Sequence, residues 1–495
     1  MSHRLPILRA VIALVVLVPA AHATEDVWDA RGFNRNREFF FQFPYEQVDP
    51  LTGNLVLSFT DLILPGNAGF DLRIQRTYNS KIFRNGQPGT LDEDSWAGVG
   101  WTLHLGRVRN PTAGVPGPVE MPDGSSHRLY NHIDSTGRFI TREHWVYNRS
   151  TAKLLLTNGM IYTFGRNVTL SSGQQFLYVT RIEDPFGNTV DVTYMTGAGQ
   201  PQDGIASIVQ DLGAGQQRTV TFAAGGTRQS LQSMSFLGRT WTYTMADSNA
   251  AGFSLLTRVQ PPAGPSWNYG YETVAPVKNE LVSLATPQGA TVQYQYSEVE
   301  FRIGNTFPTR SRAVTRRTTG GRDVAAGVWT YAYATGAGQN ETIIASPCVT
   351  TTHTFLGVGN FATQGAAWRV GLPSRIVTSV GSTVLQDETR TWSPSVAISG
   401  DEEIIGFNRD VDIFVPLMTS RRISRGGRNY DTSYSYNSSN FNDYARPATI
   451  SETGELSRTT SRVFQYGFGP SYIVDRIASE TVSSPGGGSF SENHE

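Results

Sequence analysis

The sequence predicts an all-β fold, a winding array of antiparallel β-hairpins. Three observations predict it: the composition, the alternation of apolar with polar residues, and the recurrence of turn-forming dipeptides. Glycine accounts for 50 of the 495 residues and aromatic residues for 11%, whereas only 17% are charged. Many short strands joined by tight turns have this composition. The hydrophobic fraction of 39% is too high for general disorder.

Alternation is clear in residues 70–75 and 101–105, where every second residue is apolar. Successive side chains of a strand point to opposite faces, so alternation places one set in a core and the other in solvent. The dipeptides Asn85-Gly86, Asp123-Gly124 and Asn158-Gly159 are typical of type I′ hairpin turns, in which both central residues take positive φ. The strand-like flanks of Asn158-Gly159 predict a hairpin there.

A repeat follows. Its anchor residues are 25 or 26 positions apart, and each is followed by a turn signal and an alternating strand that ends in aromatic residues. The anchors are Ile182, Ile208, Met234, Val259 and Leu284. The three strongest copies place a Pro-x-Gly turn at Gly187, Gly264 and Gly289. One hairpin cannot bury its own face but stacked neighbours can, so a fixed period of this length predicts a winding array.

These patterns divide the chain into six regions. We expect a secretory signal peptide at 1–23 and an N-terminal segment at 24–46, with a turn or two of helix and a plug or edge element at 39–41. An opening region of hairpins at 47–178 precedes the repeats at 179–300. A looser β region occupies 301–482, where residues 391–407 interrupt the period, and 483–495 has the composition of a flexible C-terminal tail.

The signal peptide is predicted from its layout. Arg4 and Arg9 precede an apolar run at 10–20, and Ala21-His22-Ala23 gives a small-x-small cleavage site. The run is about half of the roughly 20 residues that a membrane span needs. We therefore expect a secreted or cell-surface protein, with a periplasmic location as an alternative, and no membrane span after the signal is removed.

Charge and cysteine content exclude several classes. Without the signal segment the chain has 39 basic and 42 acidic residues and no long basic run, so no nucleic-acid partner is expected. Cys348 is the only cysteine, which excludes an intrachain disulfide and a thiolate metal cluster. Its surroundings look strand-like, and we expect a small buried apolar side chain rather than a nucleophile.

The opening region carries a resemblance. Residues 47–62 are followed by 64–67, by Arg76-Thr77-Tyr78-Asn79-Ser80, and by Gly98-Val99-Gly100-Trp101. This succession resembles the opening of RHS (rearrangement hot spot, or YD-repeat) proteins over about residues 45–108. The hairpins at 179–297 are consistent with that family. Its repeat core, Tyr-x-Tyr-Asp-x-x-Gly-Arg, has only the stretched match of 434–437 with 444–447, so the strict repeat is degenerate.

The resemblance implies a secreted β-shell segment without enzymatic activity. Such a segment would enclose or present a cargo or toxin domain that this chain lacks. Its expected partner is downstream chain or a second polypeptide that completes the shell. The alternative is an extracellular carbohydrate-binding or adhesin-type module, for which a glycan would be the partner. A secreted hydrolase with an unrecognised carboxylate site is the third hypothesis.

No catalytic, cofactor-binding or metal residue is expected. The nucleophile elbow, the zinc-protease motif and the phosphate-binding loops are absent from the sequence. His127, His132 and His144 lie within 18 residues, but ordinary strand or loop histidines are the favoured interpretation over a metal site. The acidic triplets at 92–94 and 401–403 lack the spacing of a calcium loop and are interpreted as solvated turns.

The aromatic residues that end the repeats allow two interpretations, a sugar-stacking surface or a packed core. Core packing is favoured because aromatic side chains that alternate with Thr and Gln on strands usually pair across the sheet. The residues concerned are Tyr194, Tyr243, Tyr269, Tyr271, Tyr294 and Tyr296.

Overall fold

The computed structural model describes residues 40–41, 44–83, 95–112, 114–132, 137–170, 173–247, 253–272, 279–303, 307–322, 324–334, 340–357, 359, 365–405, 408–438, 440–468 and 472–493. The signal segment, the stretch 24–39, Asn85-Gly86 and the acidic triplet at 92–94 lie outside these residues. In the described part of the chain, no helix is long and apolar enough to cross a membrane.

The strands form two antiparallel sheets. The smaller one, called here the inner sheet, has five strands in chain order. A 3₁₀ turn, η1 (Asn67–Gly69), joins its two longest strands. The strands are β1 (Phe40–Phe41), β2 (Glu46–Val48), β3 (Leu55–Leu64), β4 (Leu72–Asn79) and β5 (Trp101–Thr102).

The larger sheet, called here the wall, contains all the remaining described strands. Its first half comprises β6 (Arg107–Arg109), β7 (Val119–Glu120), β8 (Ser126–His127), β9 (Tyr130–Asn131), β10 (Arg138–Ile140), β11 (Val146–Asn148), β12 (Lys153–Leu155), β13 (Ile161–Thr169), β14 (Gln175–Glu183), β15 (Thr189–Tyr194), β16 (Ile205–Asp211), β17 (Gln217–Gly225), β18 (Ser230–Phe236), β19 (Arg239–Asp247) and β20 (Ser254–Gln260).

Its second half comprises β21 (Trp267–Tyr271), β22 (Leu281–Ala285), β23 (Ala290–Ile303), β24 (Phe307–Gly321), β25 (Gly327–Tyr333), β26 (Glu341–Ala345), β27 (Thr350–Phe355), β28 (Pro373–Val380), β29 (Thr383–Ile405), β30 (Asn408–Arg425), β31 (Arg428–Ser435), β32 (Thr449–Thr453), β33 (Arg458–Phe468), β34 (Tyr472–Ser483) and β35 (Ser489–Asn493). A 3₁₀ turn, η4 (Ala367–Arg369), and a short helix, α1 (Asn440–Ala445), interrupt it.

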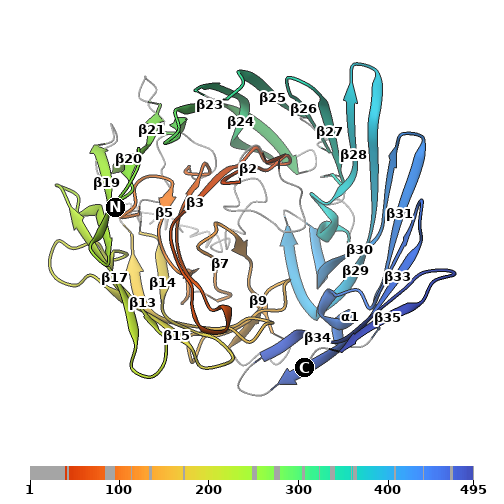
Figure 1. Ribbon diagram of the computed structural model, residues 1–495, viewed down its shortest axis with the longest axis horizontal. Helices are drawn as coiled ribbons and strands as arrows, with labels where there is room; N and C mark the ends of the chain where they lie inside the picture. The colour runs from red at the N-terminus through yellow and green to blue at the C-terminus, as the bar shows by residue number, and fades with distance from the viewer. Residues whose placement is uncertain are drawn as a thin grey trace, which may run out of the picture.

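The wall is a continuous meander. From β9 to β35 each described strand pairs antiparallel with the next one in the chain, and β6 pairs with the half of β14 that β15 leaves open. The meander winds around, and the inner sheet lies inside the curve (Figure 1). The predicted all-β hairpin array is confirmed. The helix α1 is a difference, since we expected helix only near the N-terminus.

The winding brings β34, near the end of the wall, against the turn between β12 and β13. The amide of Val474 in β34 donates to the carbonyl of Thr157 at 2.8 Å, and Asn158 forms a β-bridge with Ile473. The Tyr472 hydroxyl also donates to the carbonyl of His144 at 3.0 Å. We call this contact the seam, since it joins residues more than 300 positions apart in sequence.

The turns follow one recurring design. At Asn158-Gly159 the Leu156 amide donates to the Met160 carbonyl at 2.9 Å, and the Gly159 amide donates to the Leu156 carbonyl at 3.0 Å. Gly159 has φ of 86°, whereas Asn158 is not left-handed. The predicted hairpin is therefore confirmed, but the turn is a type I turn followed by a left-handed glycine rather than type I′. The turn at Asp123-Gly124 has the same pattern.

The five predicted repeats are five consecutive hairpins, from β14–β15 to β22–β23, and all five anchor residues are buried. Their turn glycines are left-handed, as predicted for Gly187 (φ 85°), Gly264 (82°) and Gly289 (91°). The tyrosine near the end of the second strand repeatedly donates its hydroxyl to a carbonyl 15 residues earlier, as Tyr271 does to Leu256 at 2.7 Å and Tyr296 to Leu281 at 2.9 Å. This bond ties the two strands of a hairpin together.

Other regional predictions are corrected. The described part of the expected flexible tail, residues 483–493, is a hairpin, because β35 pairs with β34 and the segment from Ser484 to Gly488 is the turn between them. Of the interruption predicted at 391–407, residues 391–405 lie in β29, a strand of 23 residues that pairs with the 18-residue β30. Phe40–Phe41 is an edge strand of the inner sheet, in agreement with the expected edge element.

Candidate functional site

The histidines singled out from the sequence do not form a metal site in the structure. Nδ1 of His127 lies 3.2 Å from a carboxylate oxygen of Glu143, and the ring lies against Trp145 at 4.1 Å between centroids. His144 is buried at the seam beside Tyr444, and burial lowers its pKa to about 4. Within the described ranges, no group of three or more His, Cys, Asp or Glu residues is arranged to hold a metal ion.

Two sequence interpretations, those of Cys348 and of the acidic triplet at 401–403, are wrong. Cys348 is exposed and lies between Ser346 and Val349 in the turn that joins β26 to β27, so it is not a buried apolar residue. The acidic triplet 401–403 lies within β29 and is not a turn. In both cases the strand boundaries, which depend on pairing with neighbours, differ from those that the local pattern indicates.

The repeat tyrosines belong to the core. Tyr243, Tyr269 and Tyr294 are 3%, 6% and 2% exposed, and burial raises the pKa of Tyr269 to about 12. Core packing, the favoured interpretation, is therefore confirmed. These rings are not available to stack on a sugar.

The site that stands out is the interface between the inner sheet and the concave face of the wall. The guanidinium of Arg76 in β4 donates from Nε to both carboxylate oxygens of Asp61 at 2.9 and 3.0 Å. Its Nη1 donates to the Tyr269 hydroxyl of β21 at 2.6 Å, and Tyr243 of β19 donates to Asp61 at 2.9 Å. An ion pair from the inner sheet is thus bonded to two strands of the wall.

A second buried pair crosses the interface directly. Arg317 of β24 donates to the Glu46 carboxylate of β2 at 2.6 and 2.9 Å, and the two side chains are 0% and 1% exposed. Arg317 also lies over the Trp329 ring at 4.6 Å. Burial alone would lower the pKa of Arg317, but the hydrogen bonds and the charge of the Glu46 carboxylate raise it above its ordinary value, so the guanidinium stays protonated.

Lys81, which follows β4, holds the inner sheet to the larger sheet through hydrogen bonds of its charged amine. Its Nζ donates to the carbonyls of Thr52 at 3.0 Å and Arg312 at 2.8 Å, and to the Ser311 hydroxyl at 2.5 Å. Trp101 Nε1 donates to the Tyr271 hydroxyl at 2.8 Å. A buried charge that is fully bonded holds one geometry strongly, because any displacement leaves it unsolvated.

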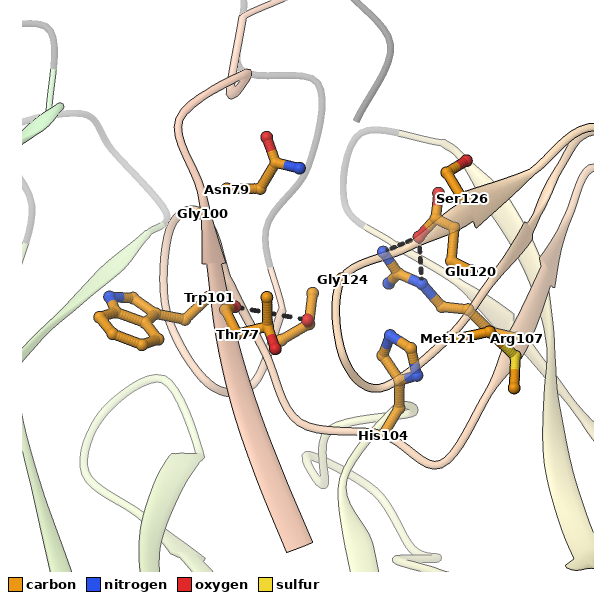
Figure 2. Close-up of a pocket in the computed structure, with 11 residues that line it drawn as sticks. Thr77, Asn79, Gly100, Trp101, His104, Arg107, Glu120, Met121, Gly124 and Ser126 are labelled. Atoms are coloured by element: carbon orange, nitrogen blue, oxygen red, sulfur yellow. Dashed lines mark hydrogen bonds and ion pairs between the residues drawn. The ribbon is translucent and has the colours of Figure 1, made fainter. Parts of the chain in front are cut away.

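A small cavity lies where the inner sheet meets β6 and β7 (Figure 2). Arg107 pairs with Glu120 at one wall of it, with Nε 2.7 Å from the carboxylate, and Thr77 donates to the carbonyl of Pro122 at 2.7 Å. His104 lines the same cavity, and burial, followed by the charge of Arg107, lowers its pKa to about 3. The volume of about 30 Å³ has room for about two water molecules. We see no nucleophile paired with a base among these residues.

Sequence reasoning did not find these buried pairs. Arg76 and Tyr78 stood in the opening motif, yet nothing local showed that they would meet the wall. The only signal was their position in a strand with apolar neighbours, where an arginine is costly unless it is paired.

The inner sheet coincides with a known sequence family. Residues 45–108 match the family model described as "Domain of unknown function (DUF6531)". The match covers β2 to β5 and most of β6, and it is the same stretch that resembles the RHS opening. No curated protein matches the sequence.

Solved structures give weak similarity over a long range. The crystal structure of TcdB2-TccC3-Cdc42 aligns with a TM-score of 0.30 and 10% identity, over 88% of this chain and 36% of that one. The Photorhabdus luminescens Tc holotoxin pore gives 0.30 and 10%, over 87% and 35%. The N-terminal domain of the effector SpvB from Salmonella typhimurium gives 0.23 and 14%, over 54% and 100%. Scores this low do not establish a shared fold, and the chain spans about a third of the first two structures.

Proposed function

We propose that the chain is a non-enzymatic shell segment whose curved β-wall encloses or presents another polypeptide. The single observation that carries the proposal is the seam, where β34 bonds back to residues 157–158 after the wall has wound around the inner sheet (Figure 1). Because β34 bonds back to the turn between β12 and β13, the curved wall separates an inside from an outside. Buried ion pairs then fix the inner sheet against the inner surface.

Export is part of this proposal. The Arg–apolar–Ala-x-Ala layout of residues 1–23 supports a cleaved signal and a secreted or cell-surface location. Mass spectrometry of the exported protein is expected to show Thr24 at the N-terminus. An exported form that begins at Met1 would refute this part of the proposal.

The carbohydrate-binding alternative was based on exposed aromatic residues along the repeats. Five of the six repeat tyrosines are at most 9% exposed and Tyr296 is partly buried against the core, so that basis is lost. Nothing among the described residues favours the hydrolase hypothesis.

The proposal is tested with the polypeptide that is encoded directly downstream. We expect it to co-purify with the mature chain and to resist proteinase K at least tenfold longer than when it is expressed alone. A downstream polypeptide that does not bind, or that is digested equally fast in both samples, contradicts the proposal.

A seam variant supplies the control. A side chain at Gly159 would meet Pro185 at 2.7 Å and Ile473 at 2.9 Å, whereas one at Gly173 would meet nothing within 4 Å. Both glycines are left-handed, with φ of 86° and 81°. Gly159→Val is therefore expected to open the seam and remove the protection, and Gly173→Val, which has the same backbone strain, is expected to retain it.

A further inference from the structure

A second and larger cavity lies beside the segment that leads into the inner-sheet strand β5. Its volume is about 180 Å³. Five segments far apart in sequence line the cavity. One is residues 95–96, which lead into β5; the other four belong to the larger sheet and are the end of β13, the loop between β15 and β16, the turn between β17 and β18, and the start of β20.

The backbone around this cavity is firmly held. The Trp96 amide donates to Oδ2 of Asp203 at 3.0 Å, and the Trp96 carbonyl accepts from the Leu231 amide at 2.8 Å. Asp203 is 5% exposed, so its carboxylate faces the cavity from a buried position. The site is therefore formed by packed and bonded segments of both sheets.

The polar lining is dense and nearly uncharged overall. The Ser230 hydroxyl donates to the Ser254 hydroxyl at 2.8 Å on one side. Arg228 also lines the cavity, and its Nε donates to Asp247 at 3.0 Å. Gln229 lines the cavity with a left-handed backbone, φ 51°, a conformation that non-glycine residues rarely adopt and that is often retained at ligand-binding positions.

We propose that this cavity binds a small neutral polyhydroxylated molecule, with the size of one sugar ring. Hydroxyl, amide and carboxylate groups around it can both give and accept hydrogen bonds, which is the pattern that a polyol presents. Phe253, which is only partly buried, supplies apolar ring surface against which the C–H face of a sugar packs. Pockets for drug-sized ligands have volumes of about 300–1,000 Å³. The cavity is smaller than this, which favours a ligand with a single ring.

Other ligand classes fit less well. A phosphate or other dianion would find one arginine, already paired with Asp247, and would face the Asp203 carboxylate. A metal ion would need several acidic or histidine ligands, and among the described residues that line the cavity only Asp203 is of this kind. This inference does not depend on the proposed shell function, because the cavity lies within the wall and the inner sheet of this chain alone.

The test uses the mature full-length chain and ligand-observed NMR. Glucose, galactose, mannose and N-acetylglucosamine are the probes, with glucuronate and inorganic phosphate as charged comparisons. We expect at least one neutral sugar to bind with a Kd of about 1 mM or tighter. We expect the charged probes to bind at least tenfold more weakly than that sugar.

Two variants locate the site. Arg228→Ala removes a polar group from the cavity, and Thr169→Trp places a large side chain at its edge; each is expected to weaken binding at least tenfold. Arg258→Ala changes an exposed arginine elsewhere on the wall, bonded to Gln260, and is expected to leave binding unchanged. The proposal is overturned if no neutral sugar binds, if phosphate or glucuronate binds more tightly, or if both cavity variants with wild-type melting temperatures bind as wild type does.

Discussion

The ion pair between Arg317 and Glu46 offers the sharpest test of how the inner sheet is held. The two residues are 271 positions apart, and both are essentially inaccessible to solvent. Arg317→Met leaves the Glu46 carboxylate buried without its partner. Removing one member of a buried pair typically costs about 3–5 kcal/mol, because the remaining charge is neither solvated nor neutralised.

An exposed ion pair shows how much of this stability cost comes from burial and how much from the loss of any arginine. Arg375 and Asp387 form a pair of the same geometry on the wall, with nitrogen–oxygen distances of 2.6 and 2.8 Å, but the side chains are 53% and 27% exposed. Exposed pairs contribute about 0.2–1 kcal/mol because water screens the charges. Arg375→Met is therefore expected to cost several-fold less than Arg317→Met.

The double variant Arg317→Met/Glu46→Leu tests whether the unpaired charge causes the loss. It removes both charges and is expected to recover at least half of the loss, since a buried pair and an apolar pair of similar volume often have similar stability. Urea unfolding of the mature chain, followed by circular dichroism, measures all four proteins. If Arg317→Met is no more destabilising than Arg375→Met, the inner sheet is not held by this pair and the reasoning fails.

Three more predictions follow from the same structure. A side chain at Gly53 (φ 65°) would lie 2.4 Å from a side chain of β24, whereas one at Gly264, which is also left-handed, would meet nothing within 4 Å. Gly53→Ala is therefore expected to lower the melting temperature well beyond Gly264→Ala. Equal shifts would contradict close packing of the Gly53 turn against β24. Tyr296→Phe removes one partly buried hydrogen bond and is expected to cost about 1 kcal/mol in urea unfolding, and a neutral result would show that the bond does not hold its hairpin. Burial lowers the pKa of His104 to about 3 and that of His144 to about 4, below the ordinary value of 6.5. As the pH falls, these histidines therefore bind protons in the unfolded chain before they do so in the folded one. The free energy of unfolding is expected to fall between pH 6.5 and 4, by up to about 3 kcal/mol per histidine. Melting curves across this range should fall less steeply for His144→Asn, and an unchanged slope would contradict the burial of its imidazole.

The sequence anticipated those parts of the fold that depend on near neighbours. Alternation showed which side chains of the repeats would be buried, and the Pro-x-Gly signals located the left-handed glycines Gly187, Gly264 and Gly289. Local signals failed where pairing decided the outcome. The segment from Ser484 to Gly488 has the composition of a linker but is a hairpin turn, because strands on both of its sides find each other.

The functional surfaces could be predicted only in outline. The opening motif marked residues 45–108 as a unit, and the structure shows that this unit is the inner sheet with its connection to the wall. Nothing in the motif indicated that Arg76 would meet Tyr269, or that Trp96 and Asp203 would border one cavity. Such contacts depend on where strands far apart in sequence come to lie.

What the sequence by itself determined is the hairpin: its strands, its turn glycines and the face that each residue presents. Backbone conformation and alternation depend on a few neighbouring residues, so they can be read locally. What only the tertiary structure decided is the winding of the wall, the seam between Thr157 and Val474, and the position of the inner sheet. These depend on the twist accumulated over the many strands between β9 and β35, and a small change in each strand would move the two ends far apart.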